Sequence, residues 1–242
     1  MKVYGHRAAA GEAPENTIAG CRHAIERGAR YLELDLGLSA DRKLVVIHDK
    51  KVNRTTYSRG AVSKYTAAEL ARMDARRSGP PWPRKKNAGV PTLDALLGAT
   101  PEVKGYYLEV KPGALSVMEN MAELLAAQFA NRFEAKRVVI TSMNQNLHHT
   151  LRELAPHIHL GLVSLRPDAV RELEEFDYQH LVLPWGVCNP FALRHARKLG
   201  VEVAVWTVND PQMIKNLYRM KVNSVITDYP SMALPMVASL MR

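Results

Sequence analysis

Residues 30–36 read RYLELDL, a strand-length run in which leucines alternate with Tyr31, Glu33 and Asp35. Successive side chains of a β-strand point to opposite faces, so the leucines share one face and the two carboxylates share the other. In a closed parallel barrel, the leucines would pack against outer helices and the carboxylates would point inward, near the carboxyl end of the strand. The stretch therefore predicts a barrel strand with an acidic inner face.

Seven further apolar runs of strand length follow the same rhythm along the chain. They span residues 2–4, 106–110, 137–141, 159–163, 180–183, 202–206 and 224–227. Segments of helical length separate them, for example 17–27, which Gly28 follows, and 190–199 and 211–220, which both begin with proline. This alternation predicts parallel strands joined by crossover helices. We expect an α/β fold, a (β/α)8 TIM barrel, with an open doubly wound sheet as the alternative.

The length of 242 residues favours one domain, 1–242. The alternation stops between His48 and Pro91, where turn signals occur at residues 58–60 and 78–81. Ordinary connections are much shorter, so we expect a small insertion after the second strand, at about residues 49–91, over one end of the barrel. It has too few apolar residues to form a core of its own.

The composition is that of a packed globular protein, with 47% hydrophobic and 24% charged residues. Cys21 and Cys188 belong to no metal-binding or disulfide pattern and are interpreted as core residues. The N-terminal residues lack the apolar run of a signal peptide, and no stretch approaches the ~20 apolar residues of a membrane helix. We therefore expect a cytoplasmic protein with no stable membrane insertion.

The formal net charge of +9 suits an anionic partner such as a phosphate ester, an acidic membrane surface or nucleic acid. The densest basic run is interrupted by prolines and Trp82. It consists of Arg76, Arg77, Arg84, Lys85 and Lys86. No nucleic-acid-binding motif surrounds it, so no nucleic-acid partner is expected. We interpret the run as a solvated loop, with a surface that steers phosphate or touches a membrane as the alternative. The oligomeric state is left open.

A third carboxylate, Glu109, lies near the end of the expected strand 106–110, two residues before Lys111. With Glu33 and Asp35 it would form an inward cluster of oxygen ligands, which suits Mg²⁺ or Ca²⁺ better than zinc. Like charges placed so close repel unless a cation or a proton lies between them. The alternative is a buried ion-pair network through Lys111. We favour the metal because such a network leaves an excess of carboxylates.

His6 follows the first strand and His48 closes the apolar run 44–47, so both are expected at the same barrel mouth. Imidazole titrates near neutrality, so one ring can accept a proton while the other donates one. Cleavage of a phosphodiester with an alkoxide leaving group requires such a pair. The other histidines are interpreted as ordinary core or surface residues. They are His23, His148, His149, His157, His159, His180 and His195.

An ordered set of short motifs runs from Val3 to about Pro230. It comprises His6-Arg7, Pro14-Glu15-Asn16-Thr17, Glu33-x-Asp35, His48-Asp49, Arg54-Thr55-Thr56, Glu69-Leu70, Pro91-Thr92-Leu93, Glu109-x-Lys111, Trp206-Thr207-Val208-Asn209 and Thr227-Asp228-Tyr229-Pro230. In this set, the chain resembles the glycerophosphodiester phosphodiesterase family. The insertion after His48 falls where that family's barrel carries an extra subdomain.

The resemblance implies a metal-dependent hydrolase that converts small-molecule glycerophosphodiesters into glycerol 3-phosphate and an alcohol. The implied roles are binding of Mg²⁺ or Ca²⁺ for Glu33, Asp35 and Glu109, general acid or base for His6 and His48, and phosphate binding for Arg7 and Lys111. Trp206 is expected either to form an apolar wall for the glycerol carbons or to be a plain core residue. Ala8 stands where the family usually has glycine, and Met143, expected in the core, stands where it usually has phenylalanine.

Two other functions stay open at this stage. Lysophospholipase D-type cleavage of lysophospholipids would use the same chemistry, with Trp82 and the basic loop touching a lipid aggregate. A non-catalytic phosphate-binding barrel is the second alternative. It is disfavoured because none of the implied acid, base or ligand positions has been replaced.

Overall fold

The computed structural model describes residues 1–83 and 87–242. Its eight barrel strands are β1 (Lys2–Gly5), β2 (Tyr31–Leu38), β4 (Gly105–Val110), β5 (Val138–Ser142), β6 (His159–Val163), β7 (His180–Pro184), β8 (Glu202–Trp206) and β9 (Ser224–Thr227). Neighbouring barrel strands are parallel, and β1 pairs with both β2 and β9, which closes the sheet. The expected (β/α)8 TIM barrel is confirmed, and the open sheet is excluded.

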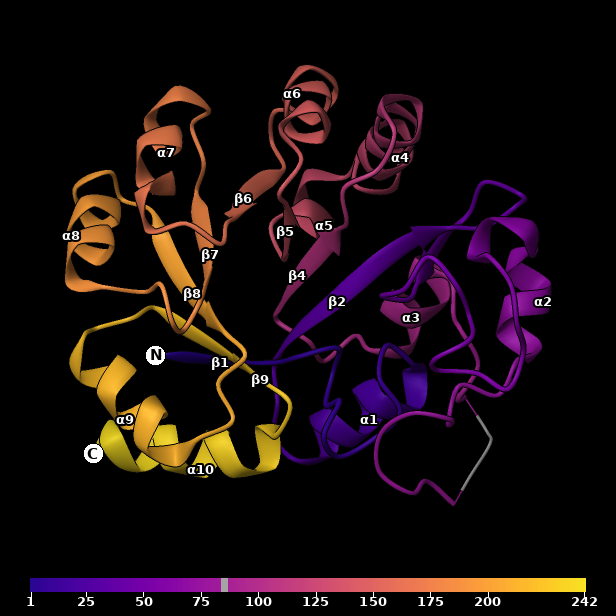
Figure 1. The fold of residues 1–242 in the computed structure, drawn as a ribbon, viewed down its shortest axis with the longest axis horizontal. Helices are drawn as coiled ribbons and strands as arrows, with labels where there is room; N and C mark the ends of the chain where they lie inside the picture. The colour runs from indigo at the N-terminus through magenta and orange to yellow at the C-terminus, as the bar shows by residue number, and fades with distance from the viewer. Residues whose placement is uncertain (84–86) are drawn as a thin grey trace.

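Helices surround the barrel on its outside (Figure 1). They are α1 (Ile18–Glu26), α3 (Leu93–Ala99), α4 (Leu115–Gln128), α5 (Arg132–Ala135), α6 (Gln145–Leu154), α7 (Glu172–Glu175), α8 (Pro190–Lys198), α9 (Pro211–Arg219) and α10 (Pro230–Leu240), with a 3-10 helix η2 (Pro167–Arg171). The three helices expected from their end signals are confirmed, and polar side chains cap them. Thr17, Asn189 and Asp210 accept backbone N–H bonds at the starts of α1, α8 and α9.

A ninth strand, β3 (Leu44–Val46), runs antiparallel to the end of β2, with Leu36 opposite Val46. β2 is eight residues long. Its first two residues pair with β1, and its last three residues, which extend beyond β1, pair with β3. The backbone N–H of Ile47 donates to the carbonyl of Asp35 at 2.9 Å. This bond places His48, the next residue, at the end of β2 where the carboxylates lie.

Two layers of buried apolar side chains stabilise the barrel. Leu32, Leu34 and Leu36 of β2 are buried in the layer between sheet and helices, as expected from the alternation. A second cluster lies on the inner face of the strands and consists of Tyr4, Tyr107, Val139, Val163, Val182, Ala204 and Ile226. The rings of Tyr4 and Tyr107 stack with centroids 4.3 Å apart. The inner cluster shows that the barrel interior is packed rather than open.

The segment after β3 contains a 3-10 helix, η1 (Val62–Lys64), and one short helix, α2 (Ala67–Arg72), at the far right of Figure 1. It buries a small apolar cluster together with residues of the barrel's own extension. The cluster is Val45, Ile47, Val52, Val62, Ala67, Leu70, Ala75 and Val90. Two of these residues belong to β3 and the residue after it, so the segment packs on the barrel's own extension. We therefore interpret 49–91 as an insertion within one domain, 1–242.

Two arginines of the basic run form contacts with other residues of the protein. Arg76 pairs with Asp74 at 2.8 Å, and Arg77 donates to the carbonyl of Asn53. Trp82 packs edge-on against His23, with centroids 5.6 Å apart. Three other residues of that run, Arg84, Lys85 and Lys86, lie outside the described residues.

Two smaller points concern the rest of the chain. Cys21 is buried as expected, whereas Met143 is 38% exposed, so its expected core position is wrong. Over residues 1–83 and 87–242, no helix combines the length and the apolar character that crossing a bilayer requires.

Candidate active site

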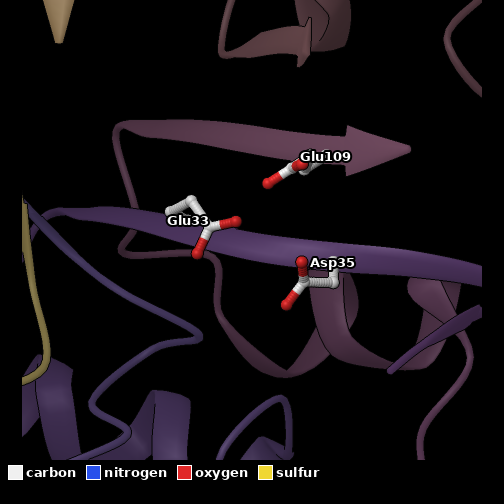
Figure 2. Close-up of side chains that lie close together, drawn as sticks. All are labelled: Glu33, Asp35 and Glu109. Carbon is white, nitrogen blue, oxygen red and sulfur yellow. The ribbon is translucent and has the colours of Figure 1, made fainter. Parts of the chain in front are cut away.

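Three carboxylates from two neighbouring strands converge at the carboxyl end of the barrel (Figure 2). Glu33 and Asp35 lie on β2, and Glu109 lies on β4 directly opposite Asp35 in the parallel register. Each contributes an oxygen to a group whose members all lie within 4.8 Å of one another. Glu33 and Asp35 are buried, and Glu109 is partly buried. The predicted inward cluster therefore exists as a compact set of oxygen donors.

Burial makes the negative charge of this cluster costly. It raises the pKa of Glu33 to about 7, and the charge of Asp35 adds to the shift. Burial also raises the pKa of Glu109, although Lys111 opposes it. Within the described chain, Glu33 Oε1 is buried without a hydrogen-bond partner. The set therefore fits a bound hard cation such as Mg²⁺ or Ca²⁺, which takes oxygen ligands and would offset this charge.

Asp35 is the centre of an ion-pair network. Lys111 Nζ lies 3.1 Å from Asp35 Oδ1 and 2.7 Å from Glu109 Oε1, while Arg7 Nε lies 3.3 Å from Asp35 Oδ2. Burial opposes ionisation of Asp35, but Lys111 and Arg7 outweigh it and lower its pKa. The expected alternative of a network through Lys111 is thus present at Asp35 and Glu109. Glu33 has no ion pair with Lys111 or Arg7, and its side chain accepts the backbone N–H of Arg7 at 2.9 Å.

Each of the two candidate histidines is held by an aspartate through Nδ1. His6 Nδ1 lies 2.6 Å from Asp228 Oδ1, and His48 Nδ1 lies 2.6 Å from Asp49 Oδ1. The other ring nitrogen of His6, Nε2, lies 3.9 Å from Glu33 Oε2. Burial lowers the pKa of His6, but the bond to Asp228 and the charge of Glu33 outweigh it and raise the pKa. The pairing leaves Nε2 of each ring available for proton transfer.

Several supporting residues had no role assigned from the sequence. The side-chain Nδ2 of Asn16 donates a hydrogen bond to Asp35 Oδ2 at 2.9 Å, and its Oδ1 accepts one from the backbone N–H of Asp35 at 3.2 Å. Arg54 bridges Asp49 at 2.8 Å and Glu15 at 2.6 Å, which fixes the aspartate that holds His48. Each of them belongs to one of the motifs noted above, but the motifs alone do not show which side chains meet.

The sequence profile of the glycerophosphoryl diester phosphodiesterase family matches residues 6–232. The chain belongs to this family. A glycerophosphodiester phosphodiesterase of Caldanaerobacter subterraneus subsp. tengcongensis is 31% identical over 256 residues, covering 97% of each chain. The one from Bacillus altitudinis is 28% identical over 239 residues, covering 96% of each.

A solved structure shows the same fold. An Oleispira antarctica phosphodiesterase in complex with the product sn-glycerol-3-phosphate superposes with a TM-score of 0.87 at 25% identity. The alignment covers 98% of this chain and 97% of that one.

In this family member, the loop after β1 depends on an unusual backbone. Arg7 has φ 48° and Ala8 has φ 76°, both in the left-handed region. A Cβ on Gly5 would lie 1.8 Å from the carbonyl oxygen of Ala8, so this close approach requires glycine at position 5. Ala8 adopts the positive φ with its methyl group fully buried.

Two hollows adjoin the carboxylates. One, of about 10 Å³, is lined by His6, Glu33, Glu109 and Trp206 among others. Trp206 is partly buried and also packs against the inner apolar cluster. The second hollow is a cleft of about 400 Å³ that includes His48 and Lys111. The two histidines thus line different hollows, His6 the small one and His48 the cleft.

Proposed function

We propose that this chain hydrolyses glycerophosphodiesters to glycerol 3-phosphate and an alcohol, by metal-dependent acid–base catalysis. The observation that carries the proposal is the convergence of Glu33, Asp35 and Glu109 beside two histidines that are each oriented by an aspartate. Membership of the phosphodiesterase family supports the reaction class.

Glu33, Asp35 and Glu109 would hold one Mg²⁺ or Ca²⁺ ion. When bound, the ion acts as a Lewis acid toward a phosphoryl oxygen and offsets part of the negative charge there. Cation binding also relieves the repulsion among the three carboxylates, which burial makes costly in its absence.

Arg7 and Lys111 are the proposed phosphate-binding residues. Both cations already lie within 3.3 Å of Asp35, so they are held at the edge of the acidic cluster. Their charges stabilise the negative charge that gathers on the phosphoryl oxygens in the transition state, which is usually the largest electrostatic contribution to such catalysis. Trp206 would cover the glycerol carbons from the side of the small hollow.

His6 and His48 divide the proton transfers. One imidazole Nε2 removes a proton from the nucleophile, and the other donates a proton to the oxygen of the departing alcohol. Asp228 and Asp49 hold Nδ1 of each ring and so fix its orientation, and the bond to Asp228 also favours the protonated form of His6. The nucleophile is either water or the 2-hydroxyl of the substrate, and the second route passes through a cyclic phosphate.

The direct test is hydrolysis of glycerophosphocholine and glycerophosphoglycerol, followed by phosphorus NMR. We expect glycerol 3-phosphate to form with Mg²⁺ or Ca²⁺ present, to stop forming after EDTA, and to form again when the ion is restored. A transient cyclic phosphate would identify the internal nucleophile. Binding of glycerol 3-phosphate without hydrolysis of either diester would instead indicate a non-catalytic phosphate-binding barrel.

A further inference from the structure

The cleft beside His48 lies between the end of β2, the insertion and the first turns of α4. Most of its wall is apolar, and the lining includes Leu38, Val62, Val117, Met118 and Met121. Val117 is 39% exposed, whereas Met118 and Met121 are buried beneath it. A volume of about 400 Å³ falls within the range of small-molecule sites. The cleft is continuous with the proposed active site because His48 and Lys111 belong to its wall.

The two hollows differ greatly in size. The hollow that includes His6 and Trp206 offers about 10 Å³, little more than the space of a single water molecule. The cleft that includes His48 is far larger. A phosphodiester held by Arg7 and Lys111 carries one group on each side of phosphorus. Of these two hollows, the one beside His48 has room for a bulky group on such a diester.

The charge of the cleft restricts what this group can be. Lys50 and Lys111 line it, together with one carboxylate, Asp49. That carboxylate is paired with both His48 and Arg54, so little of its charge is left for a ligand. Lys111 is likewise paired, with Asp35 and Glu109, so a quaternary ammonium group in the cleft would meet apolar side chains and the ammonium group of Lys50, which is unfavourable. An uncharged alkyl or aryl group would gain the apolar contacts without that penalty.

We propose that this cleft binds the departing alcohol of the diester and selects uncharged, apolar alcohols over cationic ones such as choline. The inference rests on the proposed hydrolysis of glycerophosphodiesters and adds the class of leaving group. Lys111 serves both parts of the site, because it belongs to the phosphate-binding pair and to the wall of the cleft.

The test compares kcat/KM for the hexyl ester of glycerol 3-phosphate with that for glycerophosphocholine. We expect the wild-type protein to prefer the hexyl ester by about tenfold or more, the scale of discrimination that apolar contacts supply. Val117→Asp places a carboxylate in the wall. It should lower kcat/KM for the hexyl ester and raise it for glycerophosphocholine, so that the preference falls by about tenfold or more.

Leu115→Asp is the matched control. Leu115 lies on the same first turn of α4 and is 55% exposed, but it is not part of the cleft wall. This variant should keep the wild-type preference. If the ratio of kcat/KM for the hexyl ester to that for glycerophosphocholine were the same in wild type and Val117→Asp, the inference would be overturned. So would a Val117-dependent activity on lysophosphatidylcholine with none on the hexyl ester, because the cleft would then hold an acyl chain of the retained half.

A binding measurement separates this inference from the proposed reaction. Hexyl phosphate should bind the wild-type protein more tightly than phosphocholine by calorimetry, and Val117→Asp should abolish the difference. This result without turnover of any diester would refute the reaction while supporting the cleft. Turnover with equal binding of both ligands would refute the cleft while leaving the reaction in place.

Discussion

The imidazole of His6 is bound to the carboxylate of Asp228 at 2.6 Å, although 222 residues separate them. The barrel closure brings them together, because Gly5 pairs with Thr227 across β1 and β9 and each functional residue is the next one along. Parallel strands end on the same side, so both side chains emerge at the same mouth. The first and last strands thus jointly build one half of the proposed acid–base pair.

Asp228→Asn should lower kcat by about 10²-fold or more with little change in KM. An asparagine can still accept a hydrogen bond, but it lacks the charge that stabilises the protonated ring of His6 during proton transfer. Steady-state kinetics on glycerophosphoglycerol measures the effect. The control is Asp210→Asn, which alters a nearby aspartate that caps α9, where asparagine caps equally well. Wild-type kcat in Asp228→Asn would remove His6 from the proposed chemistry.

Mg²⁺ or Ca²⁺ should raise the melting temperature of the wild-type protein, because an ion that binds only the folded state stabilises it. Glu33→Gln should lose this increase. Without added metal, the variant should be at least as stable as the wild type, since it removes a buried carboxylate whose pKa is raised to about 7. Differential scanning fluorimetry measures both effects. Glu26→Gln, on the exposed end of α1, serves as control, and an undiminished metal response in Glu33→Gln would argue against the site.

Gly5→Ala should destabilise the fold by about 1–3 kcal/mol, the usual cost of overpacking. The added Cβ would lie 1.8 Å from the carbonyl oxygen of Ala8, and backbone cannot move aside as a flexible side chain can. Urea denaturation measures the change. Gly98→Ala is the contrasting case: its Cβ would have nothing within 4 Å, and alanine is the better helix former in α3 by about 1 kcal/mol. Equal stability of the two variants would contradict the close approach.

His148 and His180 should each lower the stability as pH is lowered from about 6.5 toward 4. Burial lowers the pKa of His148 to about 3 and that of His180 to about 4. At these two histidines the folded state therefore binds fewer protons than the unfolded state in this window, and their contribution favours unfolding until pH drops below those values, whereas the raised pKa of Glu33 acts in the opposite direction. Each histidine contributes a slope of up to about 1.4 kcal/mol per pH unit.

Urea denaturation at several pH values tests this slope. His148→Gln keeps a polar partner for Tyr178, whose hydroxyl lies 2.7 Å from His148 Nδ1, but cannot titrate. It should show a shallower dependence than the wild type. His149→Gln, at the exposed neighbouring position, should retain the wild-type slope. The same slope in all three proteins would mean that His148 is not buried in its neutral form.

The alternation in residues 30–36 was enough to predict the inner face of β2, because the direction of successive side chains is a local property of a strand. The eight strand positions and their crossover helices followed from the same periodic patterns. The cluster of Glu33, Asp35 and Glu109 was also predictable once parallel strands were assumed. Met143 was misplaced because its bulk suggested burial, whereas the loop after β5 leaves it at the surface.

Three features of the site depend on the tertiary structure. They are the bond between His6 and Asp228, the ion pairs that Asp35 forms with Lys111 and Arg7, and the cleft against α4. Each joins segments that are distant in the chain, and local patterns carry no information on which distant side chains meet. The shape of a cleft in particular depends on how the insertion and α4 pack against β2. Sequence periodicity therefore determined the barrel strands and their inward carboxylates. The packing of distant segments, including the closure of β1 on β9, decided which charged side chains contact one another.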